Sequence, residues 1–158
     1  MSDTEKLDLN RYVPAMITFL ANKLATGASI SYRKHFGIGV VEWRLIALLA
    51  VEEKITANRI CQVIGLDKSA VSRSLQILEA AGRITGEVDS KDGRRYAVSL
   101  TPEGKALHDR VLKVALERER RLLSDLSPDE VDTLVNLLAR MQTKVGYVNE
   151  YDPPASSQ

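Results

Sequence analysis

The chain has 158 residues, a hydrophobic content of 44% and a formal net charge of +1 at pH 7. This length suits one domain or one domain with an extension, and the apolar content excludes an intrinsically disordered chain. The single cysteine excludes a disulfide within the chain and, with no secretory signal pattern at the N-terminus, predicts a cytoplasmic protein. We predict no membrane partner, because no apolar run approaches the roughly 18 residues that span a bilayer.

The charge is distributed unevenly. Residues 1–53 carry six basic and six acidic side chains, and residues 96–158 carry eight and ten. Residues 54–95 carry eight and five, so this is the only net basic part of the chain. Because local positive charge drives phosphate binding, the pattern agrees with a nucleic-acid partner for the middle of the chain.

Two helices are expected before this basic part. The first runs from about Asn10 to near His35, with Pro14 tolerated only in its first turn. Its apolar face is set by Ile17, Leu20, Leu24 and Ala28. The second runs from Val41 to Glu52 and is apolar on almost all sides, so we expect it at the centre of the domain, with Trp43 near its start as a core anchor or a wall of a ligand pocket.

A short helix and a tight turn follow. Thr56 is a candidate N-cap, and Gly65 is a candidate C-cap in the left-handed conformation. Asp67 is expected to cap the next helix after a turn of only three residues, which is the spacing of a helix-turn-helix. The buried stripe of the short helix is predicted to consist of Ala57, Ile60, Cys61 and Ile64.

The second helix of the pair, residues 68–81, has two stripes. Val71, Leu75 and Leu78 are expected to face inward, with Ser74 and Ala81 beside them. The opposite stripe is small and polar, and it has side chains that hydrogen-bond base edges in the major groove. It is either an ordinary solvated face or a set of DNA contacts, and the candidates are Lys68, Ser69, Ser72, Arg73 and Gln76.

A β-hairpin is predicted next. Ile84, Gly86 and Val88 alternate with polar residues, as do Tyr96, Val98 and Leu100, and Asp92-Gly93 between them is a strong hairpin signal. The tip carries three cations that suit the negative potential of a minor groove, namely Lys91, Arg94 and Arg95. The alternative is a merely soluble loop.

The C-terminal part is predicted to be helical. Thr101 and Pro102 start a long helix to about Leu126, in which the charged segment 117–121 is a solvated stretch. Residues 127–130 form a capping box that opens another helix, and residues 151–158 form a disordered tail. The apolar face of that last helix is expected to consist of Val131, Leu134, Val135, Leu138, Met141 and Val145.

These outer helices argue for a dimer. The helix-turn-helix and the hairpin after it, which together form a winged helix, cannot bury these apolar stripes alone. Pairing of two chains across a two-fold axis would bury them. Such a dimer would also place two DNA-reading helices roughly 34–36 Å apart, as successive major grooves require.

We find no pattern of an enzyme. Two histidines and one cysteine give no metal-ligand cluster, and the chain has neither a glycine-rich phosphate loop nor a nucleophile elbow. We therefore predict no catalytic residue, no metal and no cofactor. Cys61 shares a buried stripe and is interpreted as an apolar filler. The rival function is a winged-helix module that binds proteins, which would not need Lys91, Arg94 and Arg95 at its tip.

The run VSRSLQILEAAGRIT at 71–85, followed by DSKDGRRYAVSLTPEG at 89–104, resembles the winged-helix domain of the MarR family of bacterial transcriptional regulators. The resemblance includes Asp92 and Arg94 of the wing, the segment 100–104 and Trp43, and it covers nearly the whole chain. It implies a mainly α fold with a small β-hairpin wing, flanked by N- and C-terminal dimerisation helices. The expected division is a dimerisation helix at 1–36, a DNA-binding domain at 37–100, dimerisation helices at 101–150 and a tail at 151–158.

The resemblance also implies a function. Family members are homodimers that bind palindromic operators, usually as repressors released by a small molecule, often an aromatic acid. Arg73 inherits the role of the major-groove arginine, Arg94 that of the minor-groove arginine, and Asp92 that of the residue orienting it. Oxidant-sensing members carry their cysteine near the start of the chain, where this sequence has none. For an effector in a cleft beside the winged domain, His35, Trp43 and Arg44 are the candidates by position.

Overall fold

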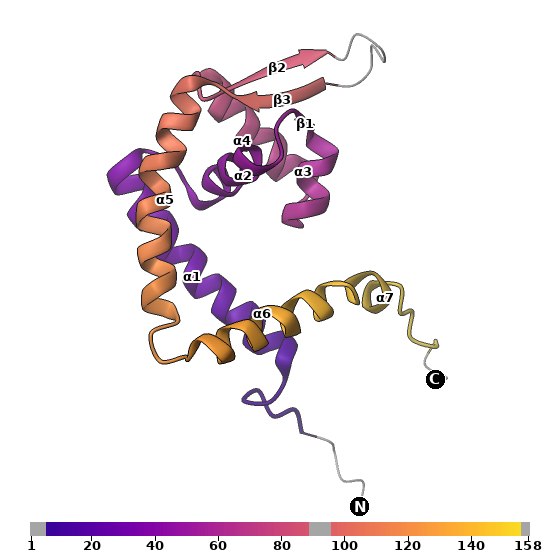
Figure 1. Cartoon of the computed structure of the whole chain (residues 1–158). Coiled ribbons are helices and arrows are strands. Elements are labelled where there is room, and N and C mark those ends of the chain that lie inside the picture. The colour runs from indigo at the N-terminus through magenta and orange to yellow at the C-terminus, as the bar shows by residue number, and fades with distance from the viewer. Residues whose placement is uncertain (1–5, 89–95, 156–158) are drawn as a thin grey trace, which may run out of the picture. The chain divides into compact units, whose positions relative to one another are not determined.

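The computed structural model describes residues 6–88 and 96–155. The chain forms two compact units, Met1–Val114 and Ala115–Gln158. The elements, in chain order, are α1 (Val13–Phe36), α2 (Val40–Val51), β1 (Ile55–Thr56), α3 (Ala57–Ile64), α4 (Lys68–Ala80), β2 (Ile84–Val88), β3 (Tyr96–Leu100), α5 (Pro102–Leu122), α6 (Pro128–Gln142) and α7 (Val145–Asn149). The fold is therefore mainly helical with a small antiparallel sheet, as the sequence predicts (Figure 1).

The sheet has three strands in the order β1-β3-β2, and both pairings are antiparallel. In the hairpin, Ile84 pairs with Leu100 and Val88 with Tyr96. The two-residue strand β1 was not expected from the sequence, because it is too short to show an alternating pattern. It joins the start of the helix-turn-helix to the wing, since Ile55 pairs with Val98.

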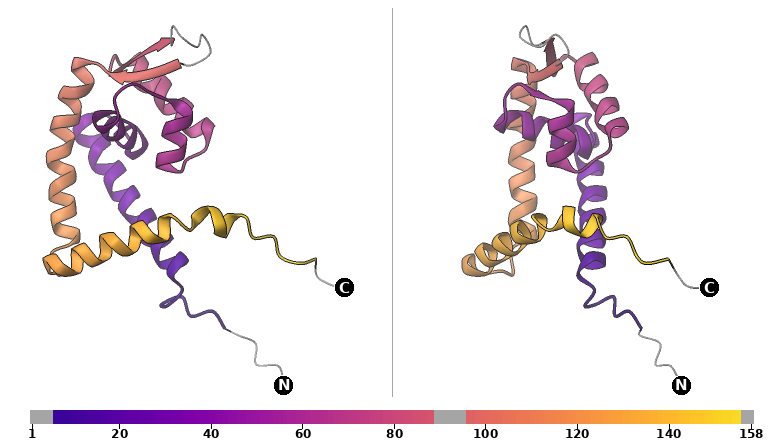
Figure 2. Two further views of the ribbon diagram at one scale, coloured as in Figure 1. Left: turned by 45° about the vertical axis from the view of Figure 1, so that its right-hand side comes forward. Right: turned by 90° about the vertical axis from the view of Figure 1, so that its right-hand side faces the viewer.

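The first unit has one hydrophobic core. Helix α2 is central to it, as predicted: Leu45, Ile46 and Leu49 are buried and α2 packs against α1, α3, α4 and β3 (Figures 1 and 2). The helices α1, α3, α4 and α5, the hairpin strands β2 and β3 and the loop before α2 each add one or two buried hydrophobic side chains, namely Ala28, Tyr32, Ile38, Ile60, Val71, Leu78, Ile84, Val98, Leu107 and Val111. This core holds α3, α4 and the wing in fixed positions around α2.

The second unit contains the rest of α5, then α6 and α7, and no described side chain in it is buried. Its capping box forms as predicted: Ser127 Oγ accepts the N–H of Glu130 at 3.3 Å, and Glu130 Oε2 accepts the N–H of Ser127 at 2.8 Å. In the part of the chain that is described, no helix is both long and apolar enough to cross a membrane.

Three local expectations were wrong. Helix α5 ends at Leu122 instead of continuing to about 126, because Pro128 favours an extended Ser127 and the chain turns before it. Val145 lies in the separate helix α7, since α6 stops before Thr143, whose hydroxyl donates to the carbonyl of Arg140 at 2.8 Å. Ala57 is exposed although it shares the stripe of Ile60, because it is the first residue of α3. Residues 156–158 of the predicted tail are outside the described residues, and 151–155 form neither helix nor strand.

Candidate nucleic-acid interface

The helix-turn-helix forms as predicted. Thr56 Oγ1 accepts the N–H of Arg59 at 3.3 Å at the start of α3, and Asp67 Oδ1 accepts the N–H of Ala70 at 2.9 Å at the start of α4. Gly65 ends α3 with φ +75°, a left-handed conformation that glycine adopts without the steric cost of a Cβ. Each cap stabilises its helix by about 1 kcal/mol. The turn therefore fixes how α4 leaves α3, and the two helices pack together (Figure 2).

Helix α4 has a buried face and an exposed polar face. Val71, Ser74 and Leu78 are buried, and Leu75 is half-buried. The predicted DNA contacts of this helix are all exposed, namely Lys68, Ser69, Ser72, Arg73 and Gln76. The separation of the two faces leaves the polar stripe free to meet a ligand without disturbing the core.

Some cations of the helix-turn-helix region are paired with carboxylates of the same chain, and others are not. Arg59 Nε and Nη2 donate to the two carboxylate oxygens of Glu52 at 2.8 and 2.7 Å, and these hydrogen bonds lower the pKa of Glu52 and raise that of Arg59. Lys54 pairs with Glu87 at 3.0 Å. Arg73 and Lys68 form no ion pair within the described residues, so no carboxylate there competes with a partner for them.

The wing is tied to α4 by a tyrosine. The Tyr96 hydroxyl donates to Glu79 Oε1 at 2.8 Å, and this hydrogen bond raises the pKa of Tyr96. The ring crosses Gly86 of the neighbouring strand so closely that a Cβ there would overlap it. The hydrogen bond therefore joins the wing to α4. The predicted minor-groove residues Lys91, Arg94 and Arg95, and the orienting Asp92, lie outside the described residues.

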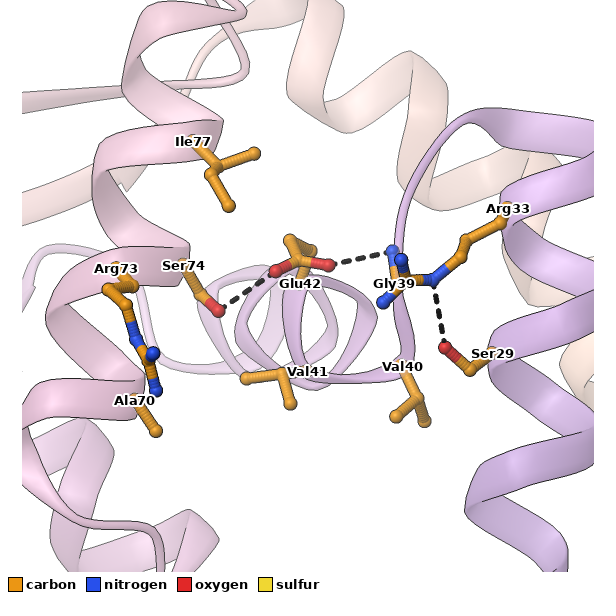
Figure 3. A pocket seen from close by; sticks show the side chains of 10 residues that line it. All are labelled: Ser29, Arg33, Gly39, Val40, Val41, Glu42, Ala70, Arg73, Ser74 and Ile77. Carbon is orange, nitrogen blue, oxygen red and sulfur yellow. Dashed lines mark hydrogen bonds between the residues drawn. The ribbon is translucent and has the colours of Figure 1, made fainter.

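An open pocket of about 320 Å³ lies beside α4 (Figure 3). Figure 3 shows α4 and α1 on opposite sides of the first turn of α2. Apolar and polar side chains line the pocket together, which is typical of small-molecule sites. The lining consists of Ser29, Arg33, Gly39, Val40, Val41, Glu42, Ala70, Arg73, Ser74 and Ile77.

The three effector candidates lie elsewhere. His35 is exposed at the end of α1. Trp43 is half-buried and stacks on His108 of α5, with ring centroids 5.6 Å apart and planes 23° apart, and it meets Tyr32 edge-on at 6.0 Å. Arg44 is half-buried on α2. The structure thus joins Trp43 to an aromatic group but does not bring the three candidates into this pocket.

Sequence reasoning missed one polar contact in the pocket wall. Ser74 Oγ donates to Glu42 Oε1 at 2.9 Å, and the N–H of Gly39 donates to Glu42 Oε2 at 2.7 Å. A serine within an apolar stripe was the available signal, because a buried hydroxyl requires a hydrogen-bond partner. The sequence did not indicate that the partner would come from α2.

Comparison with known proteins identifies the family. The family model described as the MarR family matches residues 36–95. The crystal structure of a MarR/EmrR family transcriptional regulator from Acinetobacter sp. ADP1 is 38% identical, with a TM-score of 0.84, covering 89% of this chain and 99% of that one. The uncharacterized HTH-type transcriptional regulator YkoM of Bacillus subtilis is 30% identical over 120 residues, which are 76% of this chain and 78% of YkoM.

The fold is also that of the Staphylococcus aureus protein MepR in its crystal structure with DNA, at 22% identity and a TM-score of 0.75, covering 88% of this chain and 99% of that one. The relatives are transcriptional regulators, which confirms the prediction that the chain is not an enzyme. From these similarities over most of its length, the protein belongs to the MarR family of transcriptional regulators.

Proposed function

We propose that the protein binds a specific DNA operator through helix α4. The observation that carries this proposal is the exposed polar stripe of α4, opposite a buried face. Arg73 has the donors to bond a guanine edge, and Gln76 has the donor and acceptor to pair with adenine. Ser69 and Ser72 are small enough to let the helix lie deep in the groove, and Lys68 at its first turn is placed to meet a phosphate.

The wing would supply the second set of contacts. Arg94, with Lys91 or Arg95, would enter the minor groove, and Asp92 would orient Arg94. The fixed position of β2 and β3 relative to α4 supports this role, because the Tyr96–Glu79 hydrogen bond joins the wing to α4. A MarR-fold relative crystallised with DNA, MepR, is consistent with it.

A homodimer on a palindromic operator is the proposed assembly. The first part of α1 exposes Met16, Ile17, Leu20 and other apolar side chains. Helix α6 exposes Leu134, Val135, Leu137, Leu138 and Met141. Clustered exposed apolar side chains of this kind mark an interaction surface on each helix, and a second copy of the chain is the proposed partner for each.

The operator-bound dimer would act as a repressor that a small aromatic acid releases. A pocket whose lining includes Arg33 and Arg73 together with apolar residues supports this proposal, because guanidinium groups bind carboxylates. Trp43, His35 and Arg44 stay as proposed effector contacts, and Trp43, which stacks on His108 of α5, would offer a flat apolar wall. An effector at either place would lie in the first unit, Met1–Val114, which also carries α4 and is called the winged unit below.

The test is fluorescence anisotropy with the purified protein and DNA from upstream of its own coding region, over a salt series. We expect sequence-selective binding with a steep salt slope, as phosphate contacts require. Arg73→Ala should weaken operator binding by about 1–3 kcal/mol without unfolding the protein. Lys113→Ala is the matched control, because this exposed cation of α5 lies outside the helix-turn-helix and the wing.

Equal loss in Arg73→Ala and Lys113→Ala would mean that only overall charge matters, and would overturn the assignment of α4. Weak binding that does not distinguish unrelated DNA, also after selection from a random pool, would favour the protein-interaction module instead. Aromatic acids are then screened on the same assay, where release of the operator is the expected result.

A further inference from the structure

The carboxylate of Glu42 joins two elements that are far apart in the sequence. It accepts the N–H of Gly39, at the start of its own helix α2, at 2.7 Å. It also accepts the hydroxyl of Ser74, in the middle of α4 and 32 positions away, at 2.9 Å (Figure 3). Glu42 is half-buried, and Ser74 is only 5% exposed.

This contact differs from the rest of the α2–α4 packing. Ser74 is the only buried polar side chain among the described residues, and its neighbours on the inner face, Val71 and Leu78, are apolar. Burial of the apolar stripe turns this face of α4 toward α2, but contacts between apolar groups are not directional, so a hydrogen bond would define the rotation of α4 about its own axis more narrowly than packing alone. A hydrogen bond to a charged acceptor is directional and stronger than a neutral one.

The rotation of α4 decides where its polar stripe points. Ser74 adjoins Arg73 in the chain, and successive residues lie about 100° apart around a helix. A change in the rotation of α4 would therefore move the Arg73, Ser72 and Gln76 side chains together relative to the bases. Base readout depends on these positions, whereas phosphate contacts tolerate small shifts.

We propose that Glu42 is a positioning residue for DNA recognition, which acts through Ser74 to set the rotation of α4. Glu42 need not touch DNA. This inference rests on the proposed function, because positioning matters only if α4 reads bases. The hydrogen bond between α2 and α4 would thus raise the selectivity of DNA binding and leave the affinity for unrelated DNA unchanged.

The two acceptor roles of Glu42 can be separated by mutation. Ser74→Ala removes the bond to α4 and leaves the Gly39–Glu42 cap of α2 intact. Glu42→Gln weakens both bonds, because the single amide oxygen can accept from only one of the two donors and neither bond is then to a charged group. Glu53→Gln is the matched control, since this glutamate, two residues after α2, forms within the described part of the chain only a surface pair with Lys105 at 3.7 Å.

The first measurement is the ratio of affinities for a duplex that the wild-type protein selects from a random pool and for a scrambled duplex of the same composition. We expect Ser74→Ala and Glu42→Gln each to lower this ratio roughly tenfold, which is about 1.4 kcal/mol. Affinity for the scrambled duplex and the salt slope should stay the same. The double variant should lose no more than the larger single loss, and Glu53→Gln should not change the ratio.

Unchanged ratios in the two single variants, with only a lower Tm for Glu42→Gln, would show that Glu42 merely caps α2, and would overturn the proposal. Additive losses in the double variant would overturn it as well. The second measurement uses the protein without DNA: residual dipolar couplings of backbone amides report the orientation of α4 relative to α2. They should change in Ser74→Ala and not in Glu53→Gln. If the wild-type protein selects no duplex, the proposed function fails, and the couplings alone decide whether Glu42 positions α4.

Discussion

Burial of apolar side chains differs between two regions of the molecule. The first is the helix-turn-helix region, residues 38–100, and the second consists of the flanking helices α1 and α6. In the helix-turn-helix region the helices and the two hairpin strands each bury at least one side chain in a common core, for example Ile60, Val71 and Leu78. In α6 no side chain is buried, and in α1 burial is confined to Ala28 and Tyr32 near its end. The first region buries its apolar side chains within the same chain. The flanking helices present an apolar surface that a partner would cover.

The polar contacts differ in the same way. The first unit has local polar contacts and also some that join distant parts of the chain, since Ser74 bonds Glu42 and Tyr96 bonds Glu79, 17 positions away. In the second unit they are local: Glu117 accepts from Arg120 and Arg121, three and four positions along α5. Distant contacts fix one element on another, and local ones stabilise a single helix turn.

The largest effect is expected where a charge is placed in the exposed apolar face of α1. Leu20 is 50% exposed in the single chain, and in the proposed dimer it would be covered. Leu20→Glu should therefore weaken dimerisation by about 3–5 kcal/mol, the cost of an unpaired buried charge. Sedimentation velocity over a concentration series measures the shift from dimer to monomer.

Lys23→Glu is the control for this experiment, because Lys23 is exposed and lies outside the apolar face of α1. It should leave the dimer intact. A Leu20→Glu variant that sediments as the wild type does would contradict the proposed role of α1, and the contrast between the two regions would then need another explanation.

A second pair of variants compares the two regions directly with one chemical change. Leu78→Ala, at a position 1% exposed in the core of the winged unit, should lower the free energy of unfolding by about 2–5 kcal/mol. Leu137→Ala, at a position 45% exposed on α6, should cost less and its cost should grow with protein concentration if a partner covers it. Urea unfolding at two protein concentrations tests both, and equal losses would remove the distinction between the regions.

The contact between Gly86 and Tyr96 is a smaller and more local test. A Cβ at position 86 would overlap the Tyr96 ring, so Gly86→Ala should displace the ring, break its hydrogen bond to Glu79 and destabilise the protein by about 0.5–1.5 kcal/mol. In a Tyr96→Ala background the same change should cost little, because the obstructing ring is absent. Thermal unfolding of the four proteins measures this coupling, and additive losses would show that the close approach does not matter.

The sequence was sufficient for the parts of the fold that depend on local patterns. The caps at Thr56, Asp67 and Ser127, the three-residue turn and the hairpin strands were all predicted, because each depends on residues within a few positions of one another. The polar stripe of α4 followed from helical periodicity. Its solvent exposure in the structure agrees with this, while DNA contact stays a prediction.

The rest depended on pairings between distant residues. Nothing local to Ile55 indicates that it pairs with Val98, and nothing local to Glu42 indicates a partner on α4. The pocket is likewise formed by residues from α1, α2 and α4, so the effector candidates chosen by position do not line it. Such pairings appear only when the core has fixed the helices relative to one another.

The smallest effect is expected for the local ion pairs of α5. Hydrogen bonds from Arg120 and Arg121 lower the pKa of Glu117 to about 2. Because the pKa in the folded state lies below the ordinary value of 4.5, the stabilising contribution is present above about pH 4.5 and is lost as the pH falls toward 2.

Glu117→Gln should therefore match the wild type near pH 2 and be slightly less stable at pH 7. Salt should remove this difference because the pair is exposed. An NMR titration of the Glu117 carboxyl together with urea unfolding at both pH values measures this. A carboxyl that titrates near 4.5 would show that the pairs do not hold in solution. The second unit would then have no lasting polar contact at this turn, and its order would depend still more on whatever covers its apolar face.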